Sequence, residues 1–343
     1  MLENIFQKQD VMRRVVYSMV PILLFSVLLY GWRVLAQMVV VFSAAILTEY
    51  LFTRHRGKKV SEAVLVTSMI YLLALPPAMP LWISAVGIIF AVALAKEAYG
   101  GFGRNVFNVA IAGRLFIFLS FPVPYNSAWL VPARIEGGSL TGLFGTTGGA
   151  VDTVTSATPL GLMYNGELPN LLHQFLGFRG GSIGESSVVL ILLAAAYLLI
   201  TKTANWRPML FTFLGALISA AAFYFAGLIP GVTPSSFESV SALVPLAAYM
   251  MSGSILYVAV FMSTDPITAP NKPSAQVVYG IIIGLVSMTV RVFAGFPEGT
   301  SFGIMIGNTF ASLLDEILPK AKKKTAKSPP KKASSPATQE VSA

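Results

Sequence analysis

A short polar stretch, "DTVTSATPLG" from Asp152 to Gly161, interrupts an otherwise apolar chain. Seven consecutive positions carry four hydroxyl side chains, namely Thr153, Thr155, Ser156 and Thr158. Asp, Ser and Thr side chains bond to nearby backbone, so the stretch predicts a turn or the cap of a short helix.

A second polar group follows the glycine-rich stretch "KEAYGGFGR", and it consists of Asn105, Asn108 and Arg114. The apolar run around these residues predicts a helix inside a bilayer, where polar side chains are costly and usually serve a site. Gly-Gly-x-Gly is similar to a phosphate-binding loop, but no strand precedes it, which excludes a dinucleotide fold. Close packing of helices through small residues is the structural alternative. The polar donors could bind a cofactor ring or line an ion path.

Acidic residues stand at the ends of several predicted spans. Asp265 follows one span directly and precedes Pro266, so it either caps the loop or gates a cation. Glu97 is the second candidate for an ion pathway, whereas Glu49 and Asp315 are expected at the membrane interface. We expect Arg291 and Glu298 to pair across a short turn. The chain has no cysteine and two distant histidines, which excludes thiolate sites and argues against a His-rich metal site.

The composition is that of an integral membrane protein. Of 343 residues, 55% are hydrophobic and 11% charged, with a mean hydropathy of +0.71. Soluble domains carry about 25% charged residues. No cleavable signal peptide is evident, since the first apolar run lacks a small-residue cleavage site.

Apolar runs of suitable length predict ten transmembrane helices. They lie near 15–31, 34–52, 60–75, 81–96, 106–121, 186–201, 208–228, 242–263, 276–293 and 299–317. The third and fifth runs are short and the eighth contains Pro245, so we expect broken or re-entrant helices there.

Basic residues near the spans predict the orientation. With the N-terminus in the cytoplasm, the inner segments hold Lys8, Arg13, Arg14, Arg54, Arg56, Lys58, Lys59, Lys96, Arg104, Lys202, Arg207 and Lys272. The outer loops hold only Arg33, Arg134 and Arg179. Both termini are therefore expected inside and the hydroxyl-rich loop outside.

The loop divides the spans into five plus five. The predicted parts are a first membrane half (1–121), an extracytoplasmic loop (122–185), a second membrane half (186–318) and a disordered basic cytoplasmic tail (319–343). An odd number of spans per half predicts an inverted repeat, a common plan in transporters. We expect the tail lysines to lie against anionic lipid headgroups rather than to bind nucleic acid.

The stretch Asp152-x-x-Thr155-Ser156-Ala157-Thr158 is close to the D-x-x-[ST]-[GS]-A-T acceptor pattern of proteins that carry FMN as a phosphoester on threonine. In that chemistry, a transferase moves FMN from FAD to the last threonine hydroxyl. This pattern implies that Thr158 is the acceptor.

Along nearly all of its membrane region the chain resembles the RnfD/NqrB family. This family comprises RnfD, from the Rnf ferredoxin:NAD oxidoreductase complex, and its homologue NqrB, from the sodium-translocating NADH:quinone oxidoreductase. The stretches that carry the resemblance are "ILTEYL", "KEAYGGFGRNVFNVAIAGR", "DTVTSATPLG", "FMSTDPITAP" and "YGIIIGLVSMTVRVFAGFPEGTSFGIMIGN". One departure is Val109, where the family often has proline. Its absence predicts a straighter start of that helix.

The resemblance implies a bacterial or archaeal inner-membrane subunit of a redox-driven translocase for Na⁺ or H⁺, with a fold similar to urea and ammonium channels. It also implies covalent FMN on Thr158, a riboflavin in the membrane, other membrane and extracytoplasmic subunits, including a second flavinylated subunit, and an FMN transferase. Donors from Asn105, Asn108 and Arg114 would then face a flavin ring. The alternatives are a channel or secondary transporter without a redox cofactor, and a purely structural membrane anchor.

Overall fold

The computed structural model describes residues 6–130, 158–238, 240–294 and 299–318. Seven residues named above lie outside these ranges: Arg134, Asp152, Thr153, Thr155, Ser156, Ala157 and Glu298. The basic tail also lies outside them.

Each predicted apolar run contains a helix. In the first half these are α1 (Asp10–Tyr30), α2 (Trp32–His55), α3 (Ala63–Ala74), α4 (Leu81–Phe90) with its π-helical continuation η2 (Ala91–Glu97), and α5 (Val109–Ser120). In the second half they are α9 (Val188–Ile200), α10 (Trp206–Phe225), α11 (Leu243–Met251), α12 (Ile255–Tyr257) with the π-helical η5 (Val258–Met262), α13 (Pro273–Phe293) and α14 (Gly299–Ile317). The prediction of a helical fold is confirmed.

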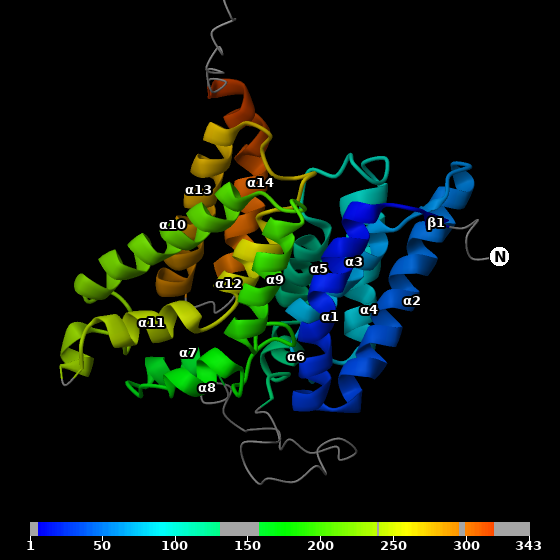
Figure 1. Ribbon diagram of the computed structural model, residues 1–343. Helices are drawn as coiled ribbons and strands as arrows, with labels where there is room; N and C mark the ends of the chain where they lie inside the picture. The colour runs from blue at the N-terminus through cyan, green and yellow to red at the C-terminus, as the bar shows by residue number, and fades with distance from the viewer. Residues whose placement is uncertain (1–5, 131–157, 239, 295–298, 319–343) are drawn as a thin grey trace, which may run out of the picture.

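Shorter elements lie between and before these helices. They are α6 (Pro122–Asn126), α7 (Pro159–Tyr164), α8 (Leu171–Leu176), the 3-10 turn η4 (Pro234–Phe237), and a parallel pair of two-residue strands, β1 (Phe6–Gln7) and β2 (Val60–Ser61). Helices α7 and α8 lie at the opposite end of the bundle from β1 and the end of α14 (Figure 1).

Four described helices, α1, α2, α10 and α13, are long and apolar enough to cross a membrane, and α11 with α12–η5 adds a fifth if the bent pair is one span. The chain is therefore a multi-pass membrane protein. The shorter apolar helices α3, α5 and α9 complete the bundle.

The two halves pack in the same pattern. In the first half, α2 packs on α4 and α4 on α5; in the second half, α10 packs on α13 and α13 on α14. The halves meet through α1 with α9 and through α5 with α14. Helices α1 to α5 lie on one side of the molecule and α10, α13 and α14 on the other, with α9 and α12 between them (Figure 1).

Small residues allow the close approach of α10 and α13. A Cβ atom at Gly284 would lie 2.3 Å from the backbone nitrogen of Ala216, and one at Gly215 would lie 2.8 Å from the carbonyl oxygen of Ile281. Membrane helices associate through such contacts because lipid supplies no hydrophobic driving force between them.

Two helices end inside the bundle in extended backbone. Helix α3 is followed by Leu75 with ψ 153°, and α11 is followed by Ser252 with ψ 139°. The eighth span bends by 64° at this second break. The break that the sequence suggested at Pro245 lies instead at Ser252, because Pro245 occupies the first turn of α11, where its missing N–H is not needed.

The backbone carbonyls at both breaks are bonded by one segment, residues 177–187, together with Arg291. The nitrogen of Ile183 donates to the Leu75 carbonyl over 3.0 Å, and the nitrogen of Gly184 donates to the Leu73 carbonyl. The guanidinium of Arg179 donates to the Met251 carbonyl, and Arg291 Nη1 donates to the Ser252 carbonyl over 3.3 Å. Broken helices persist at membrane depth only when such groups are satisfied.

The α10–α13 contact predicts the effect of Gly284→Val. The added side chain clashes with the backbone of α10, so we expect a loss of about 1–3 kcal/mol in stability, measured as thermal unfolding in detergent. Gly181→Ala is the control, since its nearest neighbour would be 3.8 Å away. Equal unfolding temperatures for the two variants would contradict this account of the packing.

Candidate functional site

Thr158 is the first residue of its motif that the structure describes, and it caps α7. Its Oγ1 accepts a hydrogen bond from the Gly161 nitrogen over 3.2 Å, and Pro159 occupies the first helical position. The predicted cap is thus confirmed. The side chain is half-buried, so part of the residue remains accessible.

Helix α7 is anchored on the break between α11 and α12. Leu160 and Met163 are buried in a cluster with Tyr249. Tyr164 Oη donates to the carbonyl of Arg291 over 3.3 Å. These contacts hold Thr158 at one end of a helix whose other end is fixed to the second half of the membrane domain.

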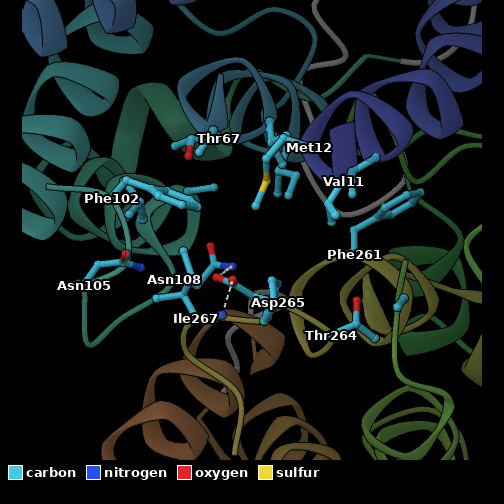
Figure 2. A pocket seen from close by; sticks show the side chains of 18 of the residues that line it. Val11, Met12, Thr67, Phe102, Asn105, Asn108, Phe261, Thr264, Asp265 and Ile267 are labelled. Carbon is cyan, nitrogen blue, oxygen red and sulfur yellow. Dashed lines mark hydrogen bonds between the residues drawn. The ribbon is translucent and has the colours of Figure 1, made fainter. Parts of the chain in front are cut away.

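A second candidate site is a cavity between the two halves (Figure 2). The cavity has a volume of about 80 Å³, which is enough for several water molecules. Its lining comes from α1, α3, η2, α5, α9, η5 and the adjoining loops, and includes Val11, Met12, Thr67, Lys96, Phe102, Asn105, Asn108, Phe261, Thr264 and Asp265. In Figure 2, Phe102, Met12 and Phe261 surround the open space, and Asn108 and Asp265 point toward one another.

The polar centre of the cavity is the contact between Asn108 and Asp265. Asn108 Nδ2 donates to Asp265 Oδ2 over 3.3 Å, and Thr268 Oγ1 donates to the same oxygen over 3.1 Å. The Ile267 nitrogen donates to Asp265 Oδ1 over 3.1 Å. Burial raises the pKa of Asp265, and these three donors oppose the increase.

Asn108 also forms the N-cap of α5, because its Oδ1 accepts from the Ile111 nitrogen over 3.2 Å. Val109 is therefore the first helical residue, the position at which proline is tolerated without bending the helix. The expectation that replacing proline straightens this helix start was wrong, since either residue fits there.

The three polar residues chosen around α5 do not form one site. Asn105 lines the cavity with Asn108, and its Nδ2 donates to the Phe107 carbonyl over 3.1 Å. Arg114 lies farther along α5 and is not among the cavity residues. It donates to Tyr125 Oη over 3.1 Å and to Ser182 Oγ over 3.2 Å, and it pairs with Glu185 at 3.5 Å.

Two acidic residues of the first half, Glu97 and Glu49, belong to ion pairs near the cavity. Glu97, a candidate for the ion pathway, pairs with Arg56 at 2.8 Å and does not line the cavity. Glu49 was expected at the interface but is 1% exposed, and it pairs with the equally buried Lys96 at 2.6 Å. Lys96 lines the cavity, which the sequence did not indicate because a lysine next to a glycine-rich loop looks like an ordinary inner-face charge.

Three further expectations have different outcomes. Asp315 accepts from the backbone nitrogens of Asn271 and Lys272 over 2.7 and 2.8 Å, ahead of α13, as an interfacial acid would. Arg179 was counted as an outer-loop charge, but it is buried against the second helix break. The expected pair of Arg291 and Glu298 stays a prediction, because Glu298 lies outside the described ranges.

Comparisons with known proteins agree with this architecture. A profile described as the NQR2, RnfD, RnfE family matches residues 3–324. The chain is 34% identical over 275 residues to a Na(+)-translocating NADH-quinone reductase subunit, designated B, of Chromohalobacter salexigens, covering 80% of this chain and 62% of that protein. The same protein of Azotobacter vinelandii is 34% identical over 274 residues (80% and 64%), and that of Klebsiella pneumoniae strain 342 is 32% identical over 284 residues (82% and 65%). The chain thus spans a little under two thirds of the length of these relatives.

Asp265→Leu tests the polar centre of the cavity. The substitution leaves three donors without their acceptor, so we expect a loss of about 1–3 kcal/mol in stability, measured by thermal unfolding in detergent. Asp315→Leu is the control, because Asp315 also accepts backbone donors but at a partly exposed position where water replaces it. A smaller loss for Asp265→Leu than for Asp315→Leu would show that the Asn108–Asp265 contact contributes little.

Proposed function

Because the chain belongs to the NQR2, RnfD, RnfE family, we propose that it is an electron-carrying membrane subunit of an ion-translocating oxidoreductase, with FMN esterified through its phosphate to Thr158. The names of the relatives support this assignment, since each is a subunit of a Na(+)-translocating reductase. The observation that carries it is the position of Thr158. The last hydroxyl of a flavin-acceptor pattern caps a short helix that is anchored to the membrane domain.

The chain's own part is to hold and surround the cofactor. FMN supplies the one- and two-electron chemistry when it is bound. The half-buried Thr158 leaves access for a transferase. The contacts of Leu160, Met163 and Tyr164 then fix the modified helix against α11 and α13.

The proposed topology is ten spans arranged as two inverted halves, with both termini inside, Thr158 outside and a fold like that of urea and ammonium channels. Two observations support it. Equivalent helices pack in the same order in each half, and the third apolar segment of each half is broken. The ends of α1 and α14 that adjoin the termini lie away from α7 (Figure 1).

The cavity is the proposed place for a second, non-covalent flavin such as riboflavin. The amide of Asn108 and the carboxylate of Asp265 match the donors and acceptors along the edge of an isoalloxazine ring, and Phe102 and Phe261 provide aromatic walls. A flavin ring is larger than the present space, so the cavity has to widen to hold it. Coupled passage of Na⁺ or H⁺ would use Asp265 and the adjacent ion pairs of Glu97 and Lys96.

The proposed partners are other membrane and extracytoplasmic subunits, including a second flavinylated subunit that exchanges electrons with Thr158-bound FMN, and an FMN transferase. Lipid contacts the outer faces of the helices, where large apolar side chains are exposed, among them Leu24, Val39, Leu193, Ile218 and Phe225.

Thr158→Ala tests the covalent attachment. The protein is produced with its flavin transferase and separated on a denaturing gel under ultraviolet light. We expect a fluorescent wild-type band and complete loss of fluorescence in Thr158→Ala, because no other hydroxyl ends the acceptor pattern.

Thr233→Ala is the matched control. Thr233 also precedes a proline, caps a short helix and accepts from a backbone nitrogen over 3.2 Å, but it lacks the preceding motif. Its band should stay fluorescent. A wild-type band without fluorescence would contradict the redox assignment and favour a channel, a transporter or a structural anchor.

Cysteine labelling tests the orientation without background, since the chain contains no cysteine. Glu167 and Lys58 are both exposed and lie on opposite sides of the proposed membrane. A membrane-impermeant maleimide should label Glu167→Cys in intact cells and Lys58→Cys only after permeabilisation. The reverse result would invert the proposed topology.

A further inference from the structure

The first two turns of α1 form one wall of the cavity. Val11, Met12 and Val15 belong to its lining. Val11 is also 48% exposed, so at this point a single side chain separates the cavity from the surface of the chain. A small displacement of these two turns would therefore open the cavity here.

Polar contacts to two neighbouring segments hold the start of α1 in place. On one side, just ahead of α3, Glu62 accepts from the Gln9 nitrogen over 2.6 Å and from Arg13 Nε over 3.0 Å, and it pairs with Arg13 Nη2 at 2.5 Å. On the other side, just after α9, the Thr201 carbonyl accepts from Arg14 Nη1 over 3.3 Å. The strand pair β1–β2 joins the same segment to the chain just ahead of Glu62. Glu62 thus binds both the backbone and a side chain of this segment.

Burial in α1 begins only farther along the helix. Its buried residues are Ser18, Met19, Ile22, Leu23, Ser26 and Leu29. The stretch from Asp10 to Tyr17 contributes none of them, and a helix end with few buried contacts opens at a low free-energy cost. The second half of the helix is fixed to the core, since Ser26 Oγ donates to the Ile183 carbonyl.

Pro21 provides a hinge between these two parts of α1. Proline has no N–H group, so the Tyr17 carbonyl receives no helical hydrogen bond from position 21, and the proline ring crowds that carbonyl. Bends in long helices occur at such positions. The side chain of Pro21 is exposed and fills no part of the core. The first two turns can therefore rotate as one body about Pro21.

We propose that residues 6–17 are a gate to the cavity, with Glu62 as its latch and Pro21 as its hinge. When the contacts of Glu62 break, the segment moves away from α3 and α9, and the cavity both opens and widens. The ligand admitted is a planar aromatic molecule with a polar edge, which Asn108 and Asp265 would bind. Its identity as the non-covalent flavin rests on the proposed function, whereas the gate itself does not.

The reactivity of a cysteine inside the cavity measures the opening. Thr264 lines the cavity and is 8% exposed, and the chain contains no cysteine of its own, so Thr264→Cys provides the sole thiol of this chain. The assembled complex is treated with N-ethylmaleimide, and labelling of this chain is followed by its intact mass. Glu62→Ala removes the acceptor of three donors, two of them from a charged side chain, so we expect labelling about tenfold faster.

Asp315→Ala is the matched control for the latch. Asp315 also accepts backbone donors ahead of a helix, but it belongs to α14 in the second half and should leave the labelling rate unchanged. Arg13→Gln breaks the charged pair from the side of the gate. It should accelerate labelling as Glu62→Ala does, and it replaces that variant if Glu62→Ala does not accumulate. Equal rates in the latch variant, Asp315→Ala and the wild type overturn the gate.

Pro21→Ala tests the hinge. The substitution restores the hydrogen bond to the Tyr17 carbonyl and stiffens α1, so labelling should become severalfold slower. An unchanged or faster rate overturns the hinge. These rates do not depend on a flavin, so a complex without flavin whose rates follow the expected order contradicts the proposed function and leaves the gate intact.

Discussion

The structure depends on one constraint, that the backbone carbonyls at two broken helices must be bonded inside the bundle. Water is not available there to bond them. The segment 177–187 meets this need on both sides. Ile183 and Gly184 bond the carbonyls that end α3, and Arg179 bonds one that ends α11. Ser26 Oγ donates to the carbonyl of Ile183, which ties the same segment to α1. The loop after α8 is thus part of the core of the membrane domain.

The two breaks also determine where polar groups can be placed. At the break after α11, the chain leaves room for Arg291 beside Gly253 and a docking surface for α7. On the other side of the bundle, the ends of α1, α3, α5 and η5 enclose the cavity with Asn108 and Asp265. In the proposed function these places correspond to an outer and an inner flavin, and the broken helices lie between them. A buried hydrogen bond from Tyr257 Oη to the Ile70 carbonyl joins the two broken segments directly.

Much of the fold was predictable because hydrophobicity is a local property. Each apolar run contains a helix, and Asn108 and Asp265 were singled out separately because a polar residue at the edge of an apolar run is unusual. Their contact was not predictable, since 157 positions separate them in the chain. Arg114 does not line the cavity with Asn108, because six residues along a helix shift a side chain by about 9 Å. Glu49 was misplaced because its partner, Lys96, lies on another helix.

The sequence by itself determined that this is a multi-pass membrane protein of its family, and which hydroxyl ends the acceptor pattern, since composition, span length and motif order can be read along the chain. Only the tertiary structure decided where the eighth span breaks, which charges are paired and which residues enclose the cavity. The physical reason is that the bonding of a broken helix or a buried charge is supplied by segments distant in sequence. Pro245 is tolerated within α11, while the break at Ser252 is held by Arg179 and Arg291.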